Sequence, residues 1–300
     1  MTLSEIKLAL RELGGGANKR LGQHFLIDSA VLKTIVEAAD IHPGDLVLEI
    51  GPGLGVLTRE LLANGAEVVA IEKDRRFVGY FNSPPTPPHE SRGGARGGVR
   101  VMHGDAATIH WHEIIGDRPW KLISNLPYSI TSLALRKALW APRPASRVVV
   151  LVQKEVAQRI VAEKTSLLSL MVALASESAR IIRCVPAGAF YPPPKVESAV
   201  LEIIPMTLAD REKRWGIDPE KIMALAKKGF AHPRKKLSSN LRSPVGARRA
   251  ARLSSTLSSD EASSPKSVPL QDVGIPERSR AEDLSPDDWA ALARAVYNQS

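Results

Sequence analysis

The stretch LVLEIGPGLGVLT, residues 46–58, decides the fold of this 300-residue chain. Its first five residues form an almost unbroken apolar run, which is typical of a parallel strand buried on both faces. Gly51, Gly53 and Gly55 follow directly, where the strand pattern changes to a helical one. Glycines at such a turn let the backbone bend sharply and let a ligand approach it closely. The stretch therefore predicts a strand, a glycine loop and a helix that together favour a nucleotide-type cofactor.

Similar apolar runs recur over the first two thirds of the chain. The predicted strands are Leu46–Ile50, Glu67–Ile71, Val99–Met102, Lys121–Ser124, Arg147–Val152, Arg180–Val185 and Ser198–Ile204. Helical patterns lie between them at Ala30–Ala39, Leu57–Ala63 and Glu155–Glu163. Strands that alternate with helices indicate an α/β doubly wound sheet.

Beyond Pro205 the strand pattern stops and helices are expected. One is predicted over Asp218–Phe230, with Asp218 as N-cap and Pro219 at the first position, and another over Ser285–Tyr297. Residues 243–276 are poor in hydrophobic side chains and rich in Ser, Arg and Pro, so we expect a flexible insert there. These patterns divide the chain into an α/β domain at residues 1–205 and a small helical domain at 206–300.

The composition favours a cytoplasmic protein with a polyanionic partner. The net charge is +9 and the isoelectric point about 9.7. The single cysteine, Cys184, excludes an intrachain disulfide framework and is expected to be a small buried residue. The first 16 residues suggest a short amphipathic helix rather than a signal peptide, and no charge-free apolar run is long enough to span a membrane. Residues 82–98 predict a surface loop, because Pro and Gly dominate them.

Polar residues end the strands that flank the glycine loop. Glu72 closes the second predicted strand and could accept hydrogen bonds from ribose hydroxyls. Asp105 follows the third strand and could accept one from a cofactor's adenine amine. The role of Glu72 fits either NAD or S-adenosylmethionine. A dinucleotide fingerprint would place a third glycine at position 56, which is Val56 here, and this lowers the case for NAD.

The tetrapeptide NLPY, from Asn125 to Tyr128, follows the fourth strand directly. An adenine N6 amine is a poor nucleophile, because its lone pair is delocalised into the ring. The Asn125 side-chain oxygen and the Leu126 carbonyl could accept hydrogen bonds from the amine, while Pro127 fixes the backbone. The Tyr128 ring could stack on the base. The motif therefore predicts a site for methyl transfer to adenine, in which catalysis is mainly alignment.

With these residues in hand, the chain resembles the small-subunit ribosomal RNA adenine N6,N6-dimethyltransferase family, also called KsgA/RsmA. The matching segments span residues 19–241 in family order. They are KRLGQHFL, LEIGPGLGVLT, AIEKDRR, GDA, NLPYSI, LVQKEVAQRI, AFYPPPKVESAV and GFAHPRKKLSSNL. The resemblance implies a Rossmann-like S-adenosylmethionine-dependent methyltransferase sheet at residues 1–205, followed by a small C-terminal α-helical domain that binds RNA or the ribosome.

The resemblance also assigns roles to residues. Phe190 would position the target adenine from the face opposite Tyr128. The cofactor would be seated by His24, Leu26, Gly51, Gly53, Glu72, Asp105 and Asn125. The substrate would be two adjacent adenines in the 3′-terminal hairpin loop of 16S rRNA, within a pre-ribosomal 30S particle, and the enzyme would act as a monomer. One departure is the segment VAEKTSLLSLM (residues 161–171), which is shorter than is usual in related chains.

A basic segment supports an RNA partner. No acidic residue occurs from Lys221 to Ser259, whereas nine Lys or Arg side chains accumulate from Lys227 to Arg252. The residues expected to contact RNA are Lys19, Arg20, Arg234, Lys235 and Lys236. His103, His110 and His112 lie close in sequence, but no cysteine or suitable carboxylate pattern accompanies them, so no metal is expected.

Three other functions remain open from the sequence. One is a methyltransferase that acts on adenine in large-subunit rRNA. A second is a ribosome-assembly or transcription factor that keeps the fold without methylating, although the intact NLPY and GPGLG motifs argue against it. The third and most distant is an NAD-dependent dehydrogenase.

Overall fold

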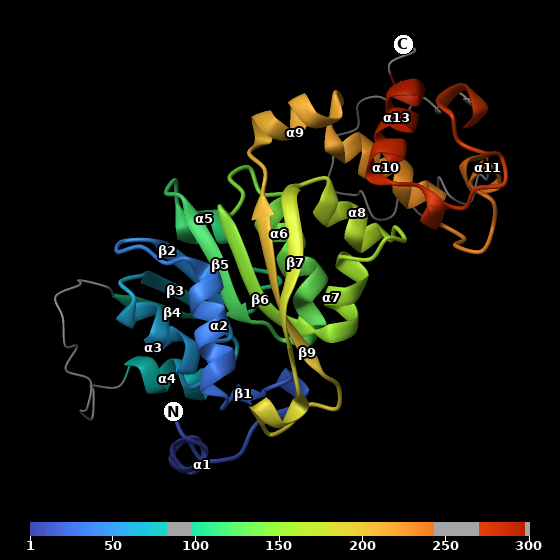
Figure 1. Cartoon of the computed structure of the whole chain (residues 1–300). Helices are drawn as coiled ribbons and strands as arrows, with labels where there is room; N and C mark the ends of the chain where they lie inside the picture. The colour runs from blue at the N-terminus through green and yellow to red at the C-terminus, as the bar shows by residue number, and fades with distance from the viewer. Residues whose placement is uncertain (83–97, 243–269, 298–300) are drawn as a thin grey trace. The chain divides into compact units, whose positions relative to one another are not determined.

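The structure is a computed structural model, and it describes residues 1–82, 98–242 and 270–297. In this described part, seven strands form one sheet in the order β4-β3-β2-β5-β6-β9-β7 (Figure 1). The strands are β2 (Leu46–Ile50), β3 (Glu67–Glu72), β4 (Val99–His103), β5 (Trp120–Asn125), β6 (Arg147–Gln153), β7 (Ser176–Val185) and β9 (Ser198–Pro205). The predicted strands are thus confirmed, although β7 begins four residues earlier than expected.

The direction of the strands fixes where a ligand can bind. The pairs β2–β3, β3–β4, β2–β5 and β5–β6 are parallel, whereas β9 runs antiparallel to β6. The chain winds outward from β2 in one direction through β3 and β4, and in the other through β5 and β6. The carboxyl ends of β2 and β5 therefore border the switch point of a Rossmann-like sheet, where such folds bind their ligands.

A second, two-stranded sheet joins distant segments of the chain. β1 (Phe25–Leu26) pairs antiparallel with β8 (Phe190–Tyr191), so that Leu26 lies opposite Phe190. This pairing brings the KRLGQHFL segment (residues 19–26) to the start of FYPPPKV (residues 190–196).

Helices cover the main sheet. They are α2 (Ser29–Ala39), α3 (Val56–Ala63), α4 (Arg75–Asn82), α5 (Trp111–Ile115), α6 (Thr131–Leu139) and α7 (Lys154–Ile160), whereas α1 (Leu3–Glu12) packs against Phe25, Leu54 and Phe77. Helix α2 starts where the Asp28 side chain accepts hydrogen bonds from two backbone N–H groups, and it lies across the sheet against β5, β6 and β9 (Figure 1). Its residues Val31, Ile35 and Ala39 are buried in the main core, as their helical spacing requires.

The chain divides into two compact units. The first comprises Met1–Gln158 and Glu177–Pro205, and the second comprises Arg159–Ser176 and Met206–Ser300. The sequence predicts a single domain boundary near Pro205. The structure has this boundary, but Arg159–Ser176 also groups with the second unit. The reason is local contact: the Trp215 indole N–H donates to the Leu174 carbonyl at 2.9 Å, and the Met206 N–H donates to the Ala175 carbonyl at 3.0 Å.

The described part of the second unit is helical. It contains α8 (Leu167–Ala173), α9 (Leu208–Trp215), α10 (Pro219–Gly229), α11 (Leu237–Arg242) and α13 (Pro286–Tyr297). Asp218 caps α10 by accepting from the Glu220 N–H, with Pro219 at the first position as predicted. The Ser285 hydroxyl accepts from the Asp288 N–H at the start of α13. Trp289 is fully buried in this unit and stacks on Phe230.

Two expectations need correction. Cys184 is exposed rather than buried, because β7 is the last strand of the sheet and its outer residues face solvent. The flexible insert predicted over residues 243–276 is wrong for its last residues, because Leu270 and Ile275 are buried and a 3₁₀ turn spans Leu270–Val273. The remainder, residues 243–269, and most of the loop expected at 82–98 lie outside the described residues.

Candidate active site

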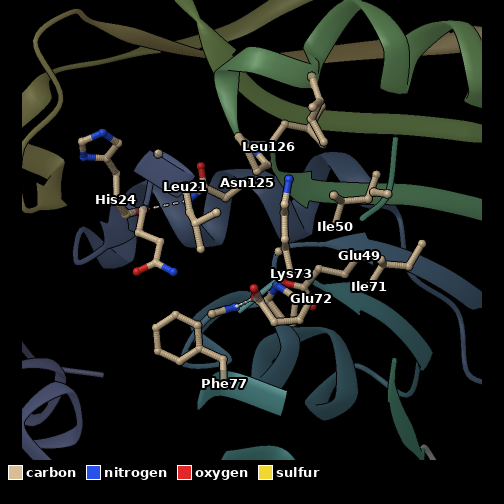
Figure 2. A pocket seen from close by; sticks show the side chains of 18 of the residues that line it. Leu21, His24, Glu49, Ile50, Ile71, Glu72, Lys73, Phe77, Asn125 and Leu126 are labelled. Atoms are coloured by element: carbon tan, nitrogen blue, oxygen red, sulfur yellow. Dashed lines mark hydrogen bonds between the residues drawn. The ribbon is translucent and has the colours of Figure 1, made fainter. Parts of the chain in front are cut away.

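A cavity opens at the carboxyl ends of β2, β3 and β5, and it lies within the first unit. Figure 2 shows His24 and Asn125 at one end of its labelled side chains, and Glu72, Lys73 and Phe77 toward the other. The predicted site residues that line it are Arg20, His24, Leu26, Gly51, Gly53, Glu72, Asp105, Asn125, Leu126, Pro127 and Tyr128. Residues from five separate segments are thus brought to a single cavity.

The glycine loop needs its glycines. Gly51, Gly53 and Gly55 have φ angles of 70°, 58° and 75°, a region that side-chain-bearing residues rarely adopt. A Cβ atom at Gly53 would stand 3.0 Å from the Phe25 ring, and one at Gly55 would stand 2.8 Å from the Phe81 ring. The loop therefore folds tightly against two aromatic side chains and keeps its backbone open toward the cavity.

Glu72 fastens this loop to the end of the next strand. One carboxylate oxygen accepts from the Gly53 N–H at 3.1 Å, and the other accepts from the Asp74 N–H at 2.7 Å. The side chain is 5% exposed, and burial raises its pKa although the backbone N–H groups oppose that rise. A carboxylate offers about four acceptor positions. The carboxylate can therefore accept further hydrogen bonds besides these two.

Asp105 is held by a partner that its sequence context does not reveal. The Lys73 ammonium lies 2.7 Å from one carboxylate oxygen, and the Ala107 N–H donates to the other at 2.9 Å. Lys73 lowers the pKa of Asp105 and keeps the carboxylate ionised. The carboxylate thus stands at the cavity as an acceptor of fixed orientation.

Glu49 is a further site residue, and it is absent from the set predicted from sequence. It is 2% exposed, lines the cavity, and accepts a hydrogen bond from the Thr58 hydroxyl at 2.7 Å. Burial raises the pKa of Glu49 to about 8, and the neighbouring Glu72 contributes to the rise. Its signal is visible in the sequence, because it is the charged residue inside the otherwise apolar strand Leu46–Ile50.

The raised pKa of Glu49 predicts a pH-dependent stability. The unfolded carboxyl ionises near its ordinary value of 4.5, whereas the folded one holds its proton to about pH 8. Its stabilising contribution is complete below about 4.5 and is lost as the pH rises toward 8, by at most about 1.4 kcal/mol for each pH unit. Glu49→Gln should flatten this decline in urea unfolding measured from about pH 5 to about pH 9. The matched control is Glu67→Gln at the half-buried start of β3; an unchanged slope in Glu49→Gln would contradict the assignment.

Asn125 is oriented by the N-terminal segment. Its side-chain N–H₂ donates to the His24 backbone carbonyl at 3.0 Å (Figure 2). The donor end of the amide is therefore engaged, and the oxygen is the end that remains to accept a bond. This orientation agrees with the acceptor role predicted from NLPY.

Tyr128 is fixed at both its ring and its hydroxyl. The hydroxyl lies 2.6 Å from the Ser198 hydroxyl, and the ring is nearly parallel to that of His24, with centroids 6.2 Å apart and an interplanar angle of 20°. Burial raises the pKa of Tyr128, so the phenol stays protonated.

Phe190 is a buried residue of β8. Its ring is 2% exposed and belongs to the main hydrophobic core, and it is not among the side chains that line the cavity. The cause is the pairing of β8 with β1, which places Phe190 opposite Leu26. Phe190 thus packs in the core, and its role toward the target adenine stays a prediction.

The predicted RNA-binding residues fall in two places. Lys19 and Arg20 belong to a 3₁₀ turn (Lys19–Leu21) of the first unit, where Arg20 lines the cavity. Arg234, Lys235 and Lys236 are exposed on a turn between α10 and α11 of the second unit. The buried Asn240 side chain holds that turn, because its N–H₂ donates to the carbonyls of Gly229 and His232 at 2.6 and 3.0 Å.

Neither a metal centre nor a membrane-spanning helix occurs in the described ranges. Among these residues, no group of three or more His, Cys, Asp or Glu side chains could hold a metal ion. Within the same ranges, no helix combines the length and the apolar character that crossing a membrane requires.

Known sequences related to this chain share one description. The family described as "Ribosomal RNA adenine dimethylase" matches residues 15–267. A "Ribosomal RNA small subunit methyltransferase A" from Dehalococcoides mccartyi is 38% identical over 288 residues, covering 92% of this chain and 87% of the relative. Proteins of the same name from Phenylobacterium zucineum and Myxococcus xanthus are 38% and 33% identical, over 82% and 96% of this chain and 83% and 93% of their own.

Solved structures share the fold. A dimethyladenosine transferase from Plasmodium falciparum superposes with a TM-score of 0.66 at 22% identity, covering 92% of this chain and 98% of its own. The 23S rRNA methyltransferase ErmE superposes with a TM-score of 0.60 at 24% identity, covering 91% and 99%. At such identities the likeness concerns the Rossmann-like methyltransferase fold.

Proposed function

Because the chain belongs to the ribosomal RNA adenine dimethylase family, we propose that it dimethylates the N6 amines of two adjacent adenines in the 3′-terminal hairpin loop of 16S rRNA. The observation that carries the proposal is the placement of NLPY. Asn125, with its amide oxygen left to accept, lies in the same cavity as the glycine loop and Glu72. The relatives at 33–38% identity named above share a small-subunit name, which favours that substrate over large-subunit rRNA.

The residues of the cavity fit S-adenosylmethionine. The open backbone at Gly51 and Gly53, the remaining acceptor positions of Glu72 and the fixed carboxylate of Asp105 suit its methionine, ribose and adenine parts. The carboxylates of Glu72 and Asp105 line the cavity, and they suit a cationic cofactor better than the pyrophosphate of NAD. When bound, this cofactor supplies a methyl group that its sulfonium already activates.

The chain then has to align the adenine amine. Asn125 Oδ1 and the Leu126 carbonyl accept hydrogen bonds from the two N–H groups, which favours a tetrahedral nitrogen with an available lone pair. Pro127 restricts the backbone conformation beside the two acceptors, and Tyr128 stacks on the base. Holding the amine in line with the methyl group supplies most of the catalysis.

The decisive experiment is a methylation assay. The protein is incubated with labelled S-adenosylmethionine and unmethylated small subunits, and the modified bases are mapped. Label on two adjacent adenines near the 3′ end of 16S rRNA is expected. Label only in large subunits would support the large-subunit alternative, and binding of the particle without label would support the non-methylating assembly factor.

We propose that the turn bearing Arg234, Lys235 and Lys236 contacts rRNA phosphates within a pre-ribosomal 30S particle. Replacing the three by Gln should reduce the magnitude of the log–log salt slope of RNA binding, by about 0.7–0.9 for each phosphate that the variant no longer neutralises. Filter binding over a range of salt concentrations measures this slope. Lys213→Gln, on α9 of the same unit, is the control, and a triple variant with the wild-type slope would show that these charges are solvated.

The assignments of location and oligomeric state complete the proposal. A cytoplasmic monomer is consistent with a ribosomal substrate and with the single cysteine of the chain.

A further inference from the structure

The loop after β4, residues 104–109, carries the carboxylate that the proposed function assigns to the cofactor's adenine, and Lys137 of α6 bonds to this loop. We infer that Lys137 is a positioning residue, which holds the loop so that Asp105 faces the adenine amine of S-adenosylmethionine. The inference rests on the proposed cofactor. Lys137 lies outside every motif by which the chain resembles its family.

Lys137 contacts the loop at two backbone carbonyls. Its ammonium donates to the Ala106 carbonyl at 2.9 Å and to the Ile109 carbonyl at 2.7 Å. The Trp111 indole N–H donates to the same Ala106 oxygen at 2.9 Å, so both lone pairs of that oxygen are engaged. A hydrogen bond from a charged donor is about twice as strong as a neutral one. The ammonium therefore fixes the loop at two points.

The part of the loop that is held in this way also forms the wall of the cavity. Gly104, Asp105, Ala106 and Ala107 all line it. The Gly104 N–H donates to the Glu72 carbonyl at 2.8 Å, and the Ala107 N–H donates to the Asp105 carboxylate at 2.9 Å. The N–H that orients the carboxylate thus follows directly after the carbonyl that Lys137 binds. A displacement of Ala106 would turn the carboxylate away from its present direction.

The surroundings of the Lys137 ammonium show that it is committed to the loop. A lysine usually keeps its ammonium in water while its stem packs on the protein. Here the side chain is half-buried, and the ammonium lies 5.3 Å from the centroid of the Trp111 ring. Burial lowers the pKa of Lys137, and Asp105 opposes this effect. The charge of Lys137 in turn adds to the effect of Lys73 in lowering the pKa of Asp105.

Helix α6 connects this loop to the catalytic motif. The 3₁₀ turn Tyr128–Ile130, which contains the last residue of NLPY, leads directly into α6. The helix is fixed on the protein by its buried residues Ala134, Leu135 and Ala138. Lys137 therefore relates the adenine end of the cofactor site to the acceptors for the target amine, which is what an alignment mechanism requires.

The test uses two ligands that differ at the atom that Asp105 would bind. S-adenosylhomocysteine presents an amine at position 6 of its base, whereas S-inosylhomocysteine presents a carbonyl oxygen, which cannot donate to a carboxylate. Calorimetry of the wild type is expected to show about 10- to 150-fold tighter binding of the adenosyl ligand. This ratio corresponds to one hydrogen bond to a charged group.

Lys137→Met keeps the apolar stem and removes the charge and the donors. It should weaken binding of the adenosyl ligand by about 10-fold and leave that of the inosyl ligand almost unchanged, so the selectivity falls by the same factor. Lys137→Arg keeps a charged donor and should recover most of the selectivity. Lys137→Gln, whose side chain is shorter and uncharged, should behave like Lys137→Met and repeats the comparison with a polar residue. Lys33→Met, at an exposed site on α2, is the control with wild-type selectivity.

A merely structural role would give a different result. It would weaken both ligands equally, and that outcome would overturn the inference. A double-mutant cycle adds a second readout: Asp105→Ala should abolish the selectivity, and adding Lys137→Met should then cause no further loss of adenosyl affinity. Additive losses would show that Lys137 does not act through Asp105.

The outcomes separate this inference from the function beneath it. If Lys137→Met keeps the wild-type selectivity while Asp105→Ala loses it, only the role of Lys137 is wrong. If the wild type binds neither ligand, the proposed cofactor is wrong. If it binds both ligands alike, the adenine contact of Asp105 is wrong. In these last two cases the inference falls as well.

Discussion

Asn125→Ala is expected to lower single-turnover methylation of unmethylated small subunits by about 10²–10³-fold, the usual cost of removing one preorganised hydrogen-bonding group from a transition state. The amine needs its acceptor most as it becomes tetrahedral, so the loss should fall on turnover rather than on binding. RNA affinity should hold, because phosphate contacts supply most of it. Cofactor affinity should fall modestly, since the same side chain holds the His24 segment at the cavity.

Asn125→Asp refines this prediction. It keeps an acceptor of similar shape. However, an aspartate cannot donate to the His24 carbonyl, which accepts a hydrogen bond from the Asn125 amide at 3.0 Å in the wild type. We expect turnover between those of the wild type and Asn125→Ala. Asn64→Ala, at the exposed C-terminal end of α3, is the control. Wild-type turnover in Asn125→Ala would remove NLPY from the catalytic machinery and favour the non-methylating assembly factor.

Glu72→Ala is expected to weaken S-adenosylmethionine binding by about 1–3 kcal/mol, or about 5- to 150-fold, measured by calorimetry. Part of this loss comes from ribose hydroxyls that no longer find an acceptor. Another part comes from the glycine loop, because the Gly53 and Asp74 N–H groups both donate to Glu72. Stability should also fall, since these buried donors would be left unpaired.

A matched variant separates these contributions. Glu72→Gln keeps one acceptor oxygen and nearly the same volume, so it should restore part of both affinity and stability. Glu67 lies at the opposite end of β3 from Glu72 and pairs with Arg118. Glu67→Ala should therefore leave cofactor affinity unchanged. If Glu72→Ala bound the cofactor as tightly as the wild type, Glu72 would be a structural carboxylate only.

The strands of the main sheet follow from local patterns. The apolar runs at β2, β3, β5 and β6 are buried on both faces, which is why they could be recognised as parallel strands. The glycine loop, Glu72, Asp105 and NLPY each lie at or just after the end of a parallel strand, and parallel strands present their carboxyl ends at one edge. Most of the cavity could thus be predicted from positions along the chain.

Other features depended on which distant segments meet. Phe190 is buried because β8 pairs with β1, and no pattern within AFYPPPKV reveals that its ring turns toward the core. The pairing of β6 with β9 places Ser198 against Tyr128, across 70 residues of sequence.

Local sequence was enough to predict the fold class, the glycine loop and the residues at the strand ends, because burial imposes a period that each segment must obey. The ionisation of Glu49, the partner of Asp105 and the pairing of His24 with Tyr128 became apparent only in the folded chain. A pKa depends on all the atoms around a buried group, and ring contacts depend on strand register. Neither is written in the spacing of residues along one segment.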